Sequence, residues 1–166
     1  MGGATIAPAL GQINAAFSGA EETLIKLIAT THALFIIPFT LISSRLTKHF
    51  SKKTVIIPSI VLYVFSGVGG GLVSNIWVLL VSRALLGTSI GLLMPISTSI
   101  VADFYKGREK TSMMGKIGAA NTIGGSISIV IAGALAGVSW RFAFAAYGVA
   151  IISLILSLRY VPFRKP

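Results

Sequence analysis

The sequence contains no cysteine, only two histidines and only four acidic residues among 166. Without cysteine the chain forms neither a disulfide framework nor a thiolate metal site, and two separate histidines make no ligand cluster. We therefore expect no metal ion and no cofactor. Charged residues amount to 11% of the chain, less than half of the roughly 25% that is typical of soluble globular domains. This composition argues against a water-soluble protein.

Most of the sequence consists of long apolar runs. The mean hydropathy is +0.89, and several runs reach the roughly 17 to 25 residues that a helix needs to cross about 30 Å of hydrocarbon. Backbone groups in lipid must be paired internally, and these runs are too long and continuous for barrel strands. The predicted fold class is an all-α, polytopic membrane helical bundle. The expected spans are residues 1–17, 24–43, 55–73, 76–102, 113–136 and 142–158.

The six spans predict one transmembrane domain over residues 1–158, followed by the start of a basic linker or tail at 159–166. The run 1–17 is short for a full span, so we expect a truncated first helix. No cleavable signal peptide is expected, since the N-terminal stretch lacks a basic start and continues into a segment that contains Pro8.

The basic residues lie mostly in alternate gaps between the spans. Gaps 44–53, 102–116 and 159–166 carry net charges of +4, +2 and +3, whereas gaps 18–26 and 137–141 carry −1 and +1. Because short loops rich in Lys and Arg remain in the cytoplasm, we expect both chain termini there. The sequence thus predicts a multi-pass protein of the inner (plasma) membrane, with the lipid bilayer as a partner.

Two other classes of function are disfavoured. The net charge of +10 resembles a nucleic-acid footprint, but the cations alternate with membrane-length runs and lack interleaved aromatics, so we expect contact with anionic lipid head groups and no nucleic-acid partner. The glycine run 67–71 resembles a dinucleotide loop but lies inside an apolar span rather than between a strand and a helix. We therefore do not expect an enzyme.

Arg83 is a cation inside an apolar span, where charge is costly and is usually kept for a cavity or a partner. Snorkelling to the outer interface is the alternative. His32 is either a proton carrier or a side chain hydrogen-bonded to a neighbouring helix, and Asn121 either lines a polar cavity or bridges two helices. Glycines that follow Arg83 in steps of four serve close helix packing or bending along a substrate path. The candidate pathway residues are Arg83, His32, Asn121, Gly87, Gly91 and Pro95.

The basic gap after the second span resembles the cytoplasmic G-x-L-x-D-R-x-G-R-K loop of the major facilitator superfamily. Leu46, Lys52 and Lys53 match in kind, serines stand at the two glycine positions, and Lys48 replaces an acid that in the family helps to hold the two halves of the transporter together. The residues of this loop motif are Ser44, Arg45, Leu46, Lys48, Ser51, Lys52 and Lys53.

Arg83, Gly87, Gly91 and Pro95 are spaced by four residues and form a stripe along the fourth span. This stripe resembles the span-4 motif of proton-coupled drug exporters. The fifth span resembles the antiporter motif of the same exporters. Gly115, Gly124 and Gly133 match that motif, and Ser128 stands where it has glycine. The resemblance implies the N-terminal six-helix half of a twelve-helix transporter.

Such a transporter exports drugs or small amphipathic molecules by alternating access, with protons and a second six-helix half, from the same or another chain, as partners. Proton coupling normally needs a carboxylate within the membrane, and none of the four acids here lies inside a span. The proton carrier is then Asp103, His32, or a residue of the other half or of the inner part of the first span. A non-transporting accessory half and an uptake facilitator for a polar metabolite are the alternatives.

Overall fold

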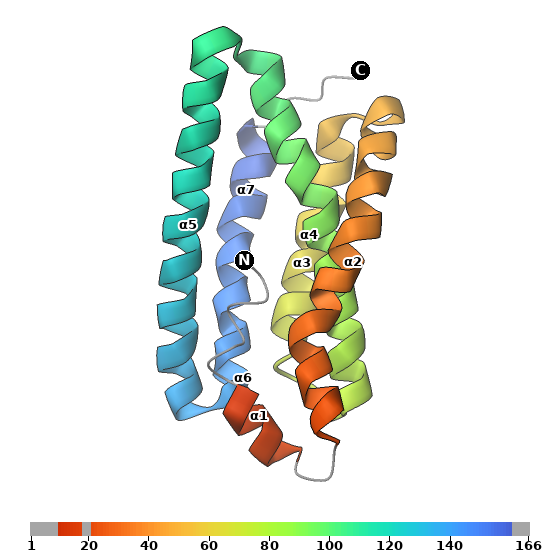
Figure 1. The fold of residues 1–166 in the computed structure, drawn as a ribbon, viewed down its shortest axis with the longest axis vertical. Coiled ribbons are helices and arrows are strands. Elements are labelled where there is room, and N and C mark those ends of the chain that lie inside the picture. The colour runs from red at the N-terminus through yellow and green to blue at the C-terminus, as the bar shows by residue number, and fades with distance from the viewer. Residues whose placement is uncertain (1–9, 18–20, 161–166) are drawn as a thin grey trace.

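The computed structural model describes residues 10–17 and 21–160, and within these ranges every regular element is a helix. The long helices run side by side along one axis (Figure 1). In chain order the elements are α1 (Leu10–Ala16), α2 (Glu22–His49), α3 (Lys52–Gly69), α4 (Ile76–Phe104), α5 (Gly107–Val138), α6 (Trp140–Ala143), the 3₁₀ helix η2 (Phe144–Val149) and α7 (Ala150–Tyr160).

Four of these helices, α2 to α5, are each long and apolar enough to cross a membrane. The expected all-α membrane bundle is thus confirmed. Large apolar side chains are exposed along α2, α4 and α5, which suits helices whose outer faces meet lipid tails instead of water.

The helices extend further than expected at the basic connections. Residues 44–49 complete α2, so only Phe50 and Ser51 separate α2 from α3. In the same way only Tyr105 and Lys106 separate α4 from α5. Lys and Arg are good helix formers and reach water through flexible stems, so a helix continues past the hydrocarbon edge. Most of the basic gap 44–53 is therefore the end of one helix and the start of the next, and a cytoplasmic position of this motif stays a prediction.

The sixth expected span also differs from a single long helix. The sixth, expected over 142–158, consists of a four-residue α-helix, six residues of 3₁₀ helix and an eleven-residue α-helix. The first is described only from Leu10, where α1 is seven residues long. Pro8 and the rest of 1–9 lie outside the described residues, as does the tail from 161 onward, while residues 159 and 160 end α7.

Close backbone packing joins α2 to α4, the most extensive helix pair among the described elements. A Cβ atom added at Gly91 would lie 2.6 Å from the carbonyl oxygen of Ile36, and one added at Gly87 would overlap the carbonyl of His32. Ser43, fully buried in α2, donates a hydrogen bond of 2.7 Å to the carbonyl of Leu92. Small residues thus let the two backbones approach, as is usual between helices in lipid.

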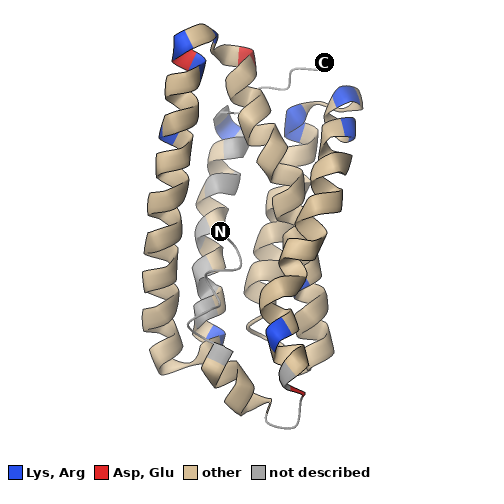
Figure 2. Cartoon of the chain, in the orientation of Figure 1, with Lys and Arg blue, Asp and Glu red and all other residues tan. Residues whose placement is uncertain are grey.

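Most of the Lys and Arg residues in the described part of the chain lie at one end of the bundle, where the α2–α3 and α4–α5 connections lie and where α7 ends (Figure 2). We call this the cationic end. The opposite end holds α1, the α3–α4 turn and the start of α6 (Figure 1). The charge alternation in the sequence therefore becomes a separation of charge between two ends, as the positive-inside rule expects of a membrane protein.

Candidate functional site

Among the residues that the structure describes, Arg83 is the largest fully buried side chain, with an exposed fraction of 0%. It lies on α4 about 10 Å along the helix from Ile76, at 1.5 Å per residue. The sequence allowed either a cavity-facing or a snorkelling arginine. A side chain with no exposed area does not reach the interface in the described structure.

Two aromatic rings from η2 enclose the guanidinium of Arg83. Its central carbon lies 4.6 Å from the ring centre of Phe144 and 5.3 Å from that of Tyr147. One terminal nitrogen donates a hydrogen bond of 3.1 Å to the hydroxyl of Tyr147. Cation–π contacts of a desolvated arginine are worth about 2 kcal/mol, so the rings offset part of the cost of burying the charge.

The remaining donors of Arg83 are unsatisfied. Within the described ranges, Nε and the second terminal nitrogen have no hydrogen-bond partner. Leaving a buried donor unpaired costs about 1–3 kcal/mol, and more for a charged group. A Cβ atom at Gly70 would lie 2.9 Å from this second nitrogen, so glycine there leaves the space that the guanidinium occupies. The site therefore has unused donors aimed into a protein interior.

A row of aromatic rings extends this site toward the opposite end of the bundle. Tyr63 of α3 lies edge-on to Tyr147, with ring centres 5.7 Å apart. Phe144 contacts Trp140 at 5.9 Å, and Trp140 contacts Phe17 at 5.8 Å. The sequence analysis missed all of these side chains, since aromatic residues in apolar spans are common. The spacing of three between Phe144 and Tyr147 was the signal that could have found them.

The four residues spaced by four along α4 do not all contact the same neighbouring helix. Arg83 lies against α3 and η2, whereas Gly87 and Gly91 lie against α2. Pro95 is partly buried further along α4. His32 is half-buried, and its backbone carbonyl forms the contact surface for Gly87. The contacts of the two glycines are those of helix packing, and a place for these residues in a substrate pathway stays a prediction.

The antiporter-like residues lie on α5, which is exposed over most of its length. Asn121 is exposed there, about 25 Å along the helix from Val138, so it is not brought together with Arg83. A Cβ at Gly115 or Gly124 would meet nothing within 4 Å. Ser128 donates a hydrogen bond of 2.7 Å to the carbonyl of Gly124, and Gly133 is half-buried.

The loop-motif residues end α2 and begin α3 at the cationic end. Lys52, in the first turn of α3, pairs with Asp103 in the last turn of α4. Lys52 lies at the positive end of the α3 dipole and Asp103 at the negative end of the α4 dipole, so each charge is repelled by its own helix. The attraction between the two side chains offsets both repulsions. Ser51 caps α3 by accepting from the backbone N–H of Thr54 at 3.3 Å. The remaining motif residues Ser44, Arg45, Leu46, Lys48 and Lys53 belong to α2 or α3.

The chain is similar in sequence to known membrane transport proteins. The sequence model of the Major Facilitator Superfamily matches residues 1–166. Multidrug resistance protein 2 of Bacillus subtilis (strain 168) is 30% identical over 117 residues, which are 70% of this chain and 29% of that protein. Inner membrane transport protein YajR of Escherichia coli (strain K12) is 28% identical over 130 residues, or 76% of this chain and 27% of that protein.

Protein spinster homolog 3 of Danio rerio is 26% identical over 145 residues, which are 84% of this chain and 28% of that protein. The chain spans less than a third of the length of each of these three relatives.

Proposed function

The chain belongs to the Major Facilitator Superfamily, and we propose that it forms the N-terminal half of a transporter that exports drugs or other small amphipathic molecules in exchange for protons. The observation that carries the proposal is the buried guanidinium of Arg83 with two unsatisfied donors. A charge kept within a membrane span without a full set of partners is costly, and such charges mark substrate or ion pathways.

The likeness to multidrug resistance protein 2 supports the drug-export branch of the proposal. So does the order of the motifs, since the arginine of the fourth span is followed in the fifth by the antiporter-like glycines. The concentration of cations at one end supports a position in the plasma membrane with that end, and both termini, in the cytoplasm (Figure 2). An enzymatic activity has no part in this proposal.

The proposed mechanism is alternating access, in which two six-helix halves rock around a site near the middle of the membrane. This chain supplies one half. The exposed apolar side chains Ile123, Ile127 and Val130 of α5 form a surface that a second half, from the same or another chain, covers in the complete transporter. Substrate then binds between the halves, beside the segment that holds Arg83.

Proton coupling needs a group that takes up and releases a proton, normally a carboxylate within the membrane. Asp103 is already paired with Lys52 at the cationic end, whereas Arg83 lies near the other end of α4, so Asp103 does not serve this purpose. His32 lies on the neighbouring α2 and remains a candidate carrier. A carboxylate from the inner part of the first span or from the second half would satisfy the unused donors of Arg83 and hold or release a proton.

The test is export of a fluorescent amphipathic dye from cells that express the chain within its natural coding sequence, with and without an imposed pH gradient. Arg83→Ala should abolish export, and Arg83→Lys should retain part of it, because lysine keeps the charge but not the planar donor set. The matched control Lys110→Ala removes an exposed cation at the start of α5 and should leave export unchanged. Export and pH dependence that survive Arg83→Ala would refute the proposal.

A non-transporting accessory half is the second candidate, and the exposed apolar face of α5 favours it, because such a face also suits a separate partner chain. Crosslinking in native membranes separates the two functions. An accessory half should be captured with a different chain and should export nothing alone, whereas a transporter built from this chain should be captured with itself or run as one longer polypeptide.

A further inference from the structure

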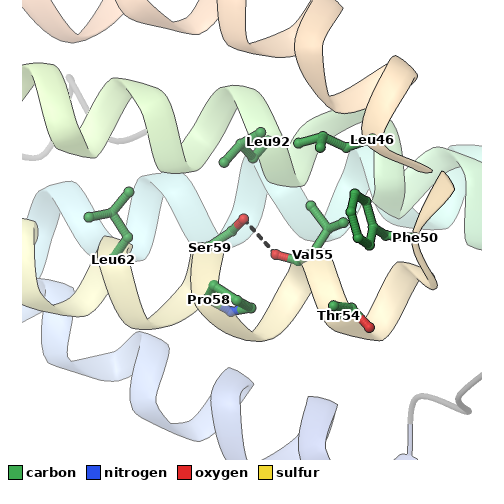
Figure 3. A pocket seen from close by; sticks show the side chains of 8 residues that line it. All are labelled: Leu46, Phe50, Thr54, Val55, Pro58, Ser59, Leu62 and Leu92. Carbon is green, nitrogen blue, oxygen red and sulfur yellow. Dashed lines mark hydrogen bonds between the residues drawn. The ribbon is translucent and has the colours of Figure 1, made fainter. Parts of the chain in front are cut away.

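A cavity of about 310 Å³ opens beside the first half of α3, near the cationic end (Figure 3). Its lining residues are Leu46, Phe50, Thr54, Val55, Pro58, Ser59, Leu62 and Leu92. Leu92, the lining residue on α4, lies about 13 Å along that helix from Arg83, at 1.5 Å per residue. The cavity therefore stops short of Arg83 and does not open its guanidinium to the cationic end.

The 3₁₀ helix η2 covers Arg83 with the rings of Phe144 and Tyr147, which are 0% and 3% exposed. We call η2 the cover. Hydrogen bonds in a 3₁₀ helix have poorer geometry than those in an α-helix, and a 3₁₀ stretch within a longer helix often marks a hinge. The cover is thus the part of the sixth span whose backbone is most easily displaced.

Arg141 joins the start of the sixth span to the turn between α3 and α4. One terminal nitrogen donates a hydrogen bond of 3.3 Å to the carbonyl of Gly71, and the other donates one of 3.0 Å to the hydroxyl of Ser74. The guanidinium also lies over the ring of Trp140, 5.0 Å from the ring centre. Arg141 is exposed, whereas Phe144 in the next turn is fully buried. An exposed side chain thus fixes the segment from which the cover begins.

The turn between α3 and α4 fits closely against this segment. A Cβ atom at Gly71 would lie 2.7 Å from the carbonyl oxygen of Arg141 and 2.9 Å from Cβ of Phe144. These contacts lie at the opposite end of the bundle, beside α1 (Figure 1), where Trp140 meets Phe17. The hydrogen bonds of Arg141 therefore hold the cover against the turn at the end that is remote from the cationic end.

Movement of the cover would satisfy some groups and expose others. Within the described ranges, two nitrogens of Arg83 have no hydrogen-bond partner while the cover is closed, and water would satisfy both. Movement would also expose two aromatic rings to water and break the hydrogen bonds of Arg141, which favours the closed state. Arg141 thus supplies contacts that favour closure and can be removed without changing Arg83 or its rings.

We infer that η2 is a movable cover over Arg83 and that Arg141 holds it closed from the opposite end of the bundle. When Arg141 releases Gly71 and Ser74, the cover moves away and water from that end reaches the guanidinium. A part for this movement in a transport cycle rests on the proposed function. The cover itself does not, because it concerns only the exposure of Arg83.

The test measures modification of Arg83 by phenylglyoxal, a small reagent for exposed guanidinium groups, in the purified chain in detergent micelles. Mass spectrometry of fragments locates each modified arginine. Arg108, exposed at the start of α5, is the internal reference, and Arg83 of the unaltered chain should react far more slowly. Arg141→Met removes both hydrogen bonds but keeps an unbranched stem. It should raise the rate at Arg83 roughly 25-fold, from about five-fold for each bond.

Two milder variants keep the test decisive if Arg141→Met folds poorly. Ser74→Ala, at an exposed position, removes one acceptor and should raise the rate about five-fold. Arg141→Lys keeps the charge without the forked donors, so its rate should lie between those of the unaltered chain and Arg141→Met. Arg141→Met combined with Ser74→Ala should react no faster than Arg141→Met alone, because both changes remove the same bond.

Lys52→Gln is the matched control, because it breaks a side-chain contact between the same two helices, α3 and α4, at the cationic end. It should leave the rate at Arg83 unchanged.

Three results would overturn the inference. Equal modification of Arg83 and Arg108 in the unaltered chain would mean that η2 does not cover the guanidinium. An unchanged rate in Arg141→Met and Ser74→Ala would mean that Arg141 does not hold the cover. A rise in Lys52→Gln as large as that in Arg141→Met would mean a general loosening of the bundle. Export is not measured, so these results are independent of the export test of Arg83→Ala.

Discussion

Gly87 is the position where one added methyl group should have the largest effect on the bundle. A Cβ atom there would overlap the backbone carbonyl of His32. Neither group is a flexible side chain, so the overlap is relieved only if α2 and α4 move apart. We therefore expect Gly87→Ala to destabilise the folded chain.

The size of the effect follows from two opposing terms. Separating packed helices by about 1 Å forfeits up to half of each van der Waals contact, and overpacking of a well-packed core typically costs about 1–3 kcal/mol. Alanine in place of glycine inside a helix returns about 1 kcal/mol. The expected net loss is up to about 2 kcal/mol in the free energy of unfolding. Gly91→Ala, at 2.6 Å from the carbonyl of Ile36, should behave in the same way.

Gly124→Ala is the matched control, because a Cβ atom there meets nothing within 4 Å. Only the helix-propensity term remains at that position, so this variant should be stabilised by up to about 1 kcal/mol. The assay is denaturant titration of the purified chain in detergent micelles, followed by circular dichroism. If Gly87→Ala proved as stable as Gly124→Ala, the close contact between α2 and α4 would be refuted.

Three further substitutions test other contacts by the same titration. Tyr147→Phe removes the hydroxyl that accepts from Arg83 and should cost about 1.5–3 kcal/mol, the range for a hydrogen bond to a charged group; no measurable loss would contradict the bond. A double-mutant cycle of Lys52→Gln and Asp103→Asn should give a coupling below about 1 kcal/mol, since both side chains are partly exposed, and the coupling should fall as salt is added. A coupling that persisted in high salt would contradict this. Ser43→Ala should lose about 0.6 kcal/mol, the average for a hydrogen bond between membrane helices, and a more stable variant would argue against the bond to α4.

The positions of the spans were predictable from the sequence, because the requirement that lipid imposes concerns consecutive residues and not contacts between distant ones. A run of apolar residues long enough to cross hydrocarbon must be helical whatever its neighbours are. This is why α2 to α5 matched the expected second to fifth spans. The helix ends were less predictable, because residues 44–49 continue a helix into the interface where hydropathy no longer distinguishes helix from loop.

The partners of Arg83 could not be predicted, because they come from distant parts of the chain. Tyr147 is 64 positions away, and no pattern along one helix identifies which neighbour will face it. The sequence did predict that a buried cation needs special surroundings, and the structure supplies aromatic rings where an acid would have been the usual expectation. The pairing of Lys52 with Asp103 escaped prediction for the same reason.

The break in the sixth span accounts for the way these rings meet Arg83. In an α-helix, Phe144 and Tyr147 would point about 60° apart, whereas in a 3₁₀ helix residues three apart lie on the same face. Two glycines that face these rings are also three apart, Gly67 in α3 and Gly70 at its C-cap. A Cβ at Gly67 would lie 2.6 Å from Cβ of Tyr147, and one at Gly70 would lie 2.5 Å from a ring carbon of Phe144. A side chain at either glycine would push its ring away from the guanidinium. The 3₁₀ turn, the two glycines and Arg83 therefore depend on one another, and a movement of η2 that uncovers the arginine must also move the sixth span along α3.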